Sequence, residues 1–364
     1  MTMDINIKKK NNYIGAALPV LVSAAAMSFL AGCSSTQLMN TSTIFAMDTV
    51  MELEIQGDET LLTEAEQKIR ELENTLSVTK SGSEVSVLNE KKKAMFTKQS
   101  GKILLEAIDV CDKTGGSLDI SVYPVLREWG FTTGEYKVPG DEELAELIKK
   151  VDHSKISVEE MPDHSYEVTI PDDMQIDLGS VVKGYTGSYI ADYFKENGVR
   201  SGLVNLGGNV ECIGNKPDGS PWRVAVKSPF SDSKSGVLGV LEASDTAVIT
   251  SGGYERFFEK DGETYWHILN PKTGKPAKNG LVSVTIVGHN GLMADGLSTA
   301  LFVKGTEKAI DFIKANAEGT REREGFGAIL VTEDKKVYVT EDIASSFSLS
   351  SEYNDCEISV IKIK

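Results

Sequence analysis

Three oxygen-bearing side chains late in the chain are spaced as a metal site would need. The segment MADGLSTALFV, residues 293–303, contains Asp295, Ser298 and Thr299, and we predict a helix over Gly296–Val303. Side chains three and four residues apart share one helix face, so these groups would point the same way. Mg²⁺ takes oxygen ligands, few of them from protein and the rest from phosphate and water. Alternatively, Asp295 only caps the helix and Thr299 packs by its methyl group.

A second segment, IDLGSVVKGY at residues 176–185, has the features of an anion site. Its pattern predicts a buried strand that ends at Asp177, a tight glycine turn and the start of a helix. The N-terminus of a helix offers backbone donors and a partial positive charge. Ser180 with its carbonyl could add a metal ligand, and Lys183 could reach a phosphate oxygen or an adenosine group. We therefore predict that this segment and residues 293–303 meet and hold a Mg²⁺–diphosphate group between them.

His267 is a candidate base. It lies in the segment YWHILNPKTG, where a predicted strand runs into a Pro–Gly turn, so it should be near a loop rim. An imidazole titrates near neutrality and can accept a hydroxyl proton, although a structural histidine bonded to the backbone fits equally well. His153, His164 and His289 lie in polar stretches and are predicted at the surface.

Two further residues could contact a ligand. Asp119 lies in a short, mostly buried stretch and needs polar partners there, either the backbone of a turn or a ligand. Met47 precedes a predicted strand and could pack on a flat ring, although a core position is the simpler interpretation. The segment Ser251-Gly252-Gly253 is similar to a glycine-rich phosphate-binding loop, but this signal alone is weak.

The composition is that of a globular protein. The chain has 364 residues, a net charge of −16, 40% hydrophobic and 25% charged residues, which fits one large or two medium domains. The acidity argues against a nucleic-acid partner, because phosphate backbones require a basic face. Predicted strands separated by turns indicate a mainly antiparallel sheet. Without internal repeats or a dividing linker, we predict one α+β unit with this sheet and a helical sub-region near residues 58–160.

The N-terminus predicts export. A basic stretch, Lys8–Lys10, precedes an uncharged apolar run, and the sequence then reads Leu-Ala-Gly-Cys up to Cys33. This is a signal peptide, and the last four residues resemble a bacterial lipobox. The resemblance implies cleavage before Cys33 and its lipidation, so we expect an extracytoplasmic protein anchored to the bacterial membrane. A transmembrane anchor is the alternative, for which the run is marginally short.

The other cysteines, Cys111, Cys212 and Cys356, are far apart and form no CxxC pair, so a zinc or redox site is not expected. We predict buried free thiols, although one disulfide is possible in an oxidising compartment.

Seven short motifs occur in an order that resembles the ApbE family of FAD:protein FMN transferases. They are residues 46–49, 117–124, 177–185, 205–209, 250–252, 267–274 and 294–299. The resemblance implies an enzyme that binds FAD and Mg²⁺, moves FMN from FAD to a Thr or Ser hydroxyl of a target flavoprotein, and releases AMP. It also implies a domain organisation of signal peptide (1–32), lipidated tether (33–43), transferase domain (44–350) and C-terminal extension (351–364).

The resemblance carries site residues over by position. His267 is the implied base, with Asp295 as the alternative. FAD contacts would be Met47, Val78, Ser117, Leu118, Asp119, Asp177, Lys183 and Leu269. Mg²⁺ would be surrounded by Ser180, Asp295, Ser298 and Thr299.

The chain departs from the family pattern at two positions. Asp48 and Ser180 stand where small residues are usual, and Asp48 is expected to alter the entrance on the flavin side. Two other functions remain open: a Mg²⁺-dependent FAD pyrophosphatase that gives FMN and AMP, and a non-catalytic flavin-binding lipoprotein.

Overall fold

The structure, a computed structural model, describes residues 39–320, 322 and 324–363. The predicted signal peptide, Cys33 and the first residues of the predicted tether lie outside these ranges. None of the helices in these ranges combines the length and the apolar character that a bilayer-spanning segment requires. Cys111, Cys212 and Cys356 are free, the first two of them buried.

A nine-stranded sheet forms the centre of the fold, and its strand order is β1-β2-β6-β7-β10-β13-β14-β15-β17. Its neighbouring strands pair antiparallel except β15 and β17, which are parallel. This confirms the predicted mainly antiparallel sheet. The strands are β1 Asn40–Ala46, β2 Thr49–Ile55, β6 Ser201–Leu206, β7 Asn209–Gly214, β10 Ala247–Gly252, β13 Leu281–Gly288, β14 Phe326–Thr332, β15 Val337–Thr340 and β17 Ile358–Ile361.

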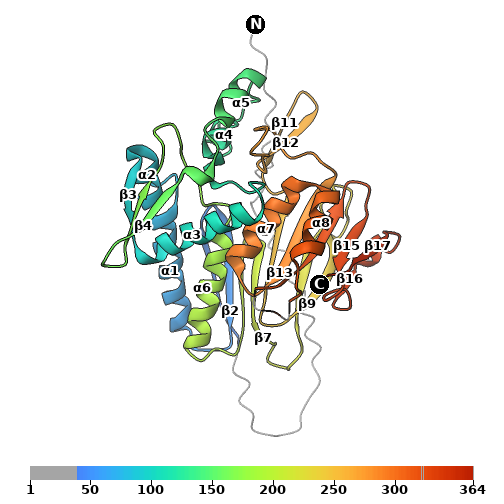
Figure 1. Ribbon diagram of the computed structural model, residues 1–364. Coiled ribbons are helices and arrows are strands. Elements are labelled where there is room, and N and C mark those ends of the chain that lie inside the picture. Colours follow the sequence, from blue (N-terminus) through green and yellow to red (C-terminus); the bar gives the residue numbers. More distant parts are fainter. Residues whose placement is uncertain (1–38, 321, 323, 364) are drawn as a thin grey trace, which may run out of the picture.

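Helices cover one face of this sheet (Figure 1). Helix α7, Gly291–Lys304, packs on β10 and β13 and also contacts α3 and α6. Nearly all of its residues are buried, including Asp295 and Ser298, because the helix is enclosed by neighbouring elements on all sides. The other helices of this layer are α1 Thr60–Leu76, α3 Lys98–Lys113, α6 Val182–Glu196 and α8 Thr306–Asn316.

Smaller elements surround the central sheet. The predicted helical sub-region contains the short helices α2, α4 and α5 and also two strands, β3 and β4, which form a three-stranded sheet with β5 just beyond it. Trp129, directly after α4, donates its indole N–H to Gly274 O at 2.7 Å and packs against the β11–β12 hairpin, so it positions the 267–274 loop. These elements are α2 Glu84–Lys91, β3 Lys93–Phe96, η1 Ile120–Val122, α4 Tyr123–Glu128, α5 Asp141–Ile148, η2 His153–Lys155, β4 Ser157–Glu160, β5 Tyr166–Thr169, β11 Phe257–Lys260 and β12 Glu263–Trp266.

A further three-stranded sheet, β16-β9-β8, packs on the other side of β7 and β14 through a second hydrophobic cluster. It consists of β8 Trp222–Lys227, β9 Val237–Ala243 and β16 Phe347–Leu349, and η3 Ser351–Tyr353 follows it.

Two predicted boundaries differ from the structure. Residues 40–43, expected in the tether, lie in β1 and pair with residues 52–55 of β2. Residues 358–361, expected in a C-terminal extension, form β17 and pair with β15. In both cases pairing with a neighbour decides the structure, because edge strands are exposed on one side and show no strong apolar pattern.

Candidate active site

The segments at residues 176–185 and 293–303 do meet, as the sequence predicts. The backbone N–H of Gly184 in α6 donates to Asp295 Oδ2 in α7 at 2.8 Å. A Cβ atom on Gly184 would lie 2.0 Å from Gly291 O and 2.7 Å from Asp295 Cβ. Glycine is therefore required at 184, because any side chain would push the two helices apart.

The local structure of both segments differs from the prediction. Helix α7 begins at Gly291, and Asn290 caps it by accepting from Met293 N at 3.0 Å. Asp295 thus lies inside the helix and is not its cap. Asp177 lies in an irregular segment rather than at the end of a strand, and its backbone N–H donates to Ile120 O at 2.8 Å.

Asp295 is a buried carboxylate with little compensation. It is 5% exposed, and burial raises its pKa to about 6, against the charge of Lys183 and the Gly184 hydrogen bond, which lower it. No ion pair to Asp295 is formed within the described residues. Asn209 lies close enough to lower the pKa of Asp295, yet its buried Nδ2 completes no well-formed hydrogen bond among the described residues. A carboxylate and a donor left open at one place are suited to a further polar ligand.

Three hydroxyl groups lie together beside this carboxylate. Ser251 in β10 is 2.7 Å from Ser298 Oγ and 3.1 Å from Thr299 Oγ1. Ser298 also donates to Asp295 O at 2.7 Å, so its hydroxyl is turned towards its own helix. Thr299 is the more accessible of the two α7 hydroxyls.

This donor set fits Mg²⁺. Among the described residues, no group of three or more His, Cys, Asp or Glu side chains could hold a metal, which disfavours a zinc-type site. One carboxylate with neighbouring hydroxyls, completed by phosphate and water, is typical of Mg²⁺. The α7 residues Asp295 and Thr299 are best placed. Within the described residues, no hydrogen bond joins Ser180 to Asp295, so the role of Ser180 as a ligand stays a prediction.

The backbone of Arg256 holds His267 in place. Both its backbone N–H and its ring Nδ1 lie at the carbonyl oxygen of Arg256, at 3.1 and 3.2 Å. A carbonyl only accepts, so Nδ1 carries the proton and Nε2 keeps its lone pair. Burial, with the charges of Arg256 and Lys183, lowers the pKa of His267 to about 3. The imidazole is therefore neutral at neutral pH and Nε2 can accept a proton. The lowered pKa makes it a weak base, and the negative charge of a bound diphosphate would raise this pKa.

Lys183 and Asp177 complete this part of the site. The charge of Lys183 lowers the pKa of both His267 and Asp295, and Lys183 directly precedes Gly184, which donates to Asp295. Burial raises the pKa of Asp177, against the Gly179 N–H, which donates at 2.9 Å, and the charge of Arg256.

The predicted flavin contacts Met47 and Val78 pack on the same hydrophobic cluster. Met47 and Asp48 form the β1–β2 turn with φ angles of 48° and 59°, the backbone of a two-residue hairpin turn. The backbone N–H of Met47 donates to Glu73 at 2.9 Å, which ties this turn to α1. The turn thereby holds Met47 at one defined place.

Both carboxylate oxygens of Asp119 have hydrogen-bond partners, and one partner is His153, which we predicted at the surface. Its Oδ1 accepts from Ser121 N and Oγ at 2.9 and 2.6 Å, and its Oδ2 lies 2.9 Å from His153 Nδ1. His153 Nε2 lies 3.0 Å from Asp112. The prediction of a surface position for His153 is wrong, since its side chain is only 11% exposed. Polarity of the surrounding sequence misled that prediction.

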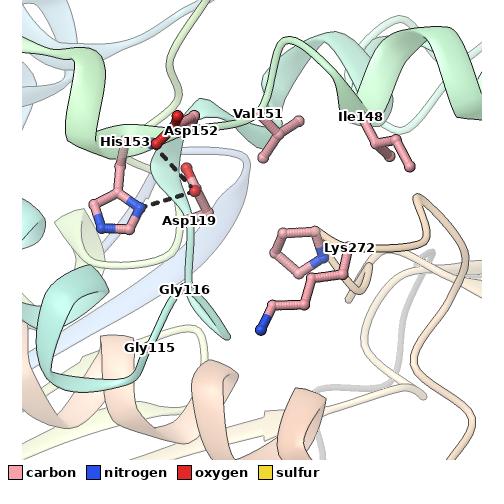
Figure 2. Close-up of a pocket in the computed structure, with 9 residues that line it drawn as sticks. Gly115, Gly116, Asp119, Ile148, Val151, Asp152, His153 and Lys272 are labelled. Carbon is pink, nitrogen blue, oxygen red and sulfur yellow. Dashed lines mark hydrogen bonds and ion pairs between the residues drawn. The ribbon is translucent and has the colours of Figure 1, made fainter.

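A cavity of about 410 Å³ lies beside Asp119 (Figure 2). Asp119 and His153 form one side of it and Lys272 the other. Its lining residues are Gly115, Gly116, Asp119, Ile148, Val151, Asp152, His153, Pro271 and Lys272. The predicted FAD contacts Ser117 and Leu118 adjoin this cavity in the chain, and Leu269 is two residues from Pro271. Leu118 also comes close to Gly296 of α7, which connects the cavity wall to the Asp295 region.

The ApbE family model matches residues 47–321. The chain belongs to the ApbE family. It is 32% identical over 309 residues to the FAD:protein FMN transferase of Vibrio cholerae, covering 81% of this chain and 90% of that protein. It is 30% identical to a protein of the same name from Treponema pallidum, covering 76% and 78%.

Solved ApbE structures share the fold. The ApbE protein of Thermotoga maritima superposes with a TM-score of 0.76 at 27% identity, covering 85% of this chain and 99% of that one. The flavin transferase ApbE of Vibrio cholerae gives 0.70 at 28% identity, covering 88% and 100%.

Within this ApbE chain, the predicted residues form three groups. The first group lies at the α6–α7 contact and consists of Lys183, Asp295, Ser298 and Thr299. The charges of Lys183 and Arg256 act on His267, and the charge of Arg256 acts on Asp177. Met47 and Val78 share one hydrophobic cluster, and residues 117–119 adjoin the cavity. The sequence missed Asn209 as a neighbour of Asp295 and His153 as a partner of Asp119. In the sequence, the two glycines directly before Asn209 and the hydroxyl of Ser251 were the signals available for a ligand site beside Asp295.

Proposed function

We propose that this protein transfers FMN from FAD to a Thr or Ser hydroxyl of a target protein in a Mg²⁺-dependent reaction and releases AMP. The family and the names of its relatives support an FAD:protein FMN transferase. The observation that carries the mechanism is the neutral His267, whose Nδ1–H donates to the carbonyl of Arg256 and leaves the lone pair of Nε2 available. The charge of Lys183 acts on both His267 and Asp295.

In the reaction, Nε2 of His267 takes the proton of the target hydroxyl. The hydroxyl oxygen forms a bond to the FMN-side phosphorus, and the bond from that phosphorus to the AMP oxygen breaks. Lys183 stabilises charge on the diphosphate between base and metal site. Asp295 and Thr299 would hold Mg²⁺, which supplies charge neutralisation on the diphosphate when bound.

The test is incubation of the purified protein with FAD, Mg²⁺ and a target that carries a Thr acceptor, followed by in-gel flavin fluorescence. We expect a fluorescent target band that requires Mg²⁺ and disappears with excess EDTA. A parallel reaction without target measures AMP. Rapid AMP release there would mean that water is the natural acceptor, and thus a pyrophosphatase. Tight FAD binding without turnover in either reaction would mean a flavin-binding protein.

We also propose that Cys33 is lipidated and that the mature protein is anchored outside the cytoplasmic membrane. The signal-peptide pattern and the Leu-Ala-Gly-Cys sequence support this proposal. Labelling of cells with a palmitate analogue should mark the wild-type protein and leave Cys33→Ala unmarked. Labelling of both proteins to the same extent would contradict the proposal.

A further inference from the structure

Arg256 connects three parts of the site, although no sequence motif pointed to it. It lies between β10 and β11, and its carbonyl oxygen accepts both hydrogen bonds from His267. Its Nη2 is 3.8 Å from Asp48 Oδ2 in the β1–β2 turn. Its charge lowers the pKa of His267 and also acts on Asp177. The backbone of Arg256 therefore lies at the base and its guanidinium group at the flavin-side turn, and its charge acts on the start of the anion segment.

The ion pair of Arg256 with Asp48 is easily exchanged. The two side chains are 48% and 79% exposed, and 3.8 Å is beyond hydrogen-bond distance. Exposed pairs of this kind contribute little stability. An arginine carries five N–H donors in a fork that matches phosphate oxygens, so a phosphate is a better partner than this distant carboxylate.

The position of Arg256 relative to the base selects which phosphate it would meet. The target hydroxyl must lie within hydrogen-bond distance of His267 Nε2 to give its proton to that nitrogen. That hydroxyl attacks the FMN-side phosphorus. Lys183, by contrast, directly precedes Gly184, whose backbone N–H donates to Asp295, and so lies on the metal side. The two cations therefore serve different parts of the diphosphate.

We infer that Arg256 is a catalytic residue that binds the FMN-side phosphoryl group, and that it exchanges Asp48 for a phosphate oxygen when FAD binds. This inference rests on the proposed FMN transfer. Charge on the transferred phosphoryl group is then stabilised from the side of the base, in the manner of arginine residues in other phosphoryl transfers.

The test compares Arg256→Met, Arg256→Lys and Asp48→Asn in the full chain. Both Arg256→Met and Asp48→Asn break the ion pair, but only the first removes the guanidinium group. We expect kcat for target flavinylation to fall about 100-fold in Arg256→Met and less in Arg256→Lys, which keeps the charge without the fork. Asp48→Asn should stay within about threefold of wild type.

FAD affinity is measured separately by flavin fluorescence quenching in EDTA, without turnover. The Kd for FAD should rise roughly tenfold in Arg256→Met, as expected for the loss of one charged hydrogen bond, and should be unchanged or lower in Asp48→Asn. An unchanged Kd or kcat in Arg256→Met would overturn the inference. An equal loss in Asp48→Asn would also overturn it, because the ion pair between the two turns would then be the important element. If the wild type transfers no FMN to a target, the proposed function fails before the variants are compared.

Discussion

Asp295 at the α6–α7 contact and Asp119 at the η1–η2 corner are buried almost equally, at 5% and 6% exposure. Their pKa values nevertheless shift in opposite directions. Burial raises that of Asp295, whereas for Asp119 the hydrogen bonds from His153 and Ser121 outweigh burial and lower it. The difference lies in the partners: Asp119 has a histidine, and Asp295 has a single backbone N–H and a neighbouring amide. A buried carboxylate left without a cation is prepared to take one from solution, while a satisfied one fixes the backbone around it.

The largest effect should follow removal of the charge of Asp295. We expect Asp295→Asn, and likewise Asp295→Ala, to reduce target flavinylation more than about 100-fold, because loss of residues that merely support a metal ligand already costs roughly 10–100-fold. In-gel flavin fluorescence with Mg²⁺ present measures this. Transfer at the wild-type rate would remove Asp295 from the metal site.

The same variant tests the pKa of Asp295 without catalysis. A carboxyl group whose folded pKa is raised to about 6 stabilises the fold below its unfolded pKa, and this contribution is lost as pH rises through about 6. In EDTA, Asp295→Asn should therefore gain stability relative to wild type between pH 4 and 7, as measured by urea unfolding. A pH-independent difference would mean that Asp295 is compensated as well as Asp119.

Gly184→Ala should separate the two helices that enclose Asp295. The added Cβ meets Gly291 O at 2.0 Å, which is backbone and cannot rotate away. We expect a loss of about 3 kcal/mol in unfolding free energy, at the upper end for overpacking. Gly187→Ala on the same helix is the control, since its nearest neighbour would be 3.8 Å away. Equal losses in both variants would point to helix α6 rather than to the close contact.

His153→Gln should make Asp119 resemble Asp295. Loss of one partner of a buried pair leaves the carboxylate under-satisfied, and we expect a cost of about 2 kcal/mol at pH 6 by chemical unfolding. The hydrogen bond to Asp119 raises the pKa of His153. Its contribution is therefore complete below the unfolded pKa and is lost as pH rises through the folded one. The deficit of the variant should shrink towards pH 9, and a constant deficit would count against an ionised pair.

The smallest effect is expected for His164→Gln. This histidine also lies beside a carboxylate, Glu160, at 2.8 Å, but both side chains are more than half exposed. Solvent screens such a pair, so the change in unfolding free energy should stay below about 0.5 kcal/mol. A larger cost would show that proximity, rather than burial, makes the His153–Asp119 pair important.

Local spacing was enough to predict part of this site. Helical periodicity places Asp295, Ser298 and Thr299 on one face regardless of what surrounds the helix. The spacing of the predicted strands, with turns between them, likewise predicted a mainly antiparallel sheet. These features depend on residues a few positions apart, so the sequence itself contains the information.

Contacts between distant residues were decided only by the tertiary structure. His153 contacts Asp119, which lies 34 positions earlier in the chain, and Arg256 contacts Asp48 in the β1–β2 turn. Strand β17 pairs with β15, although the pattern of its own residues does not clearly predict a strand. Each of these residues is polar or exposed on one side, so its local pattern is compatible with solvent. Burial and charge at such positions follow from which elements pack together, which is also why two aspartates in similar short motifs acquired opposite pKa shifts.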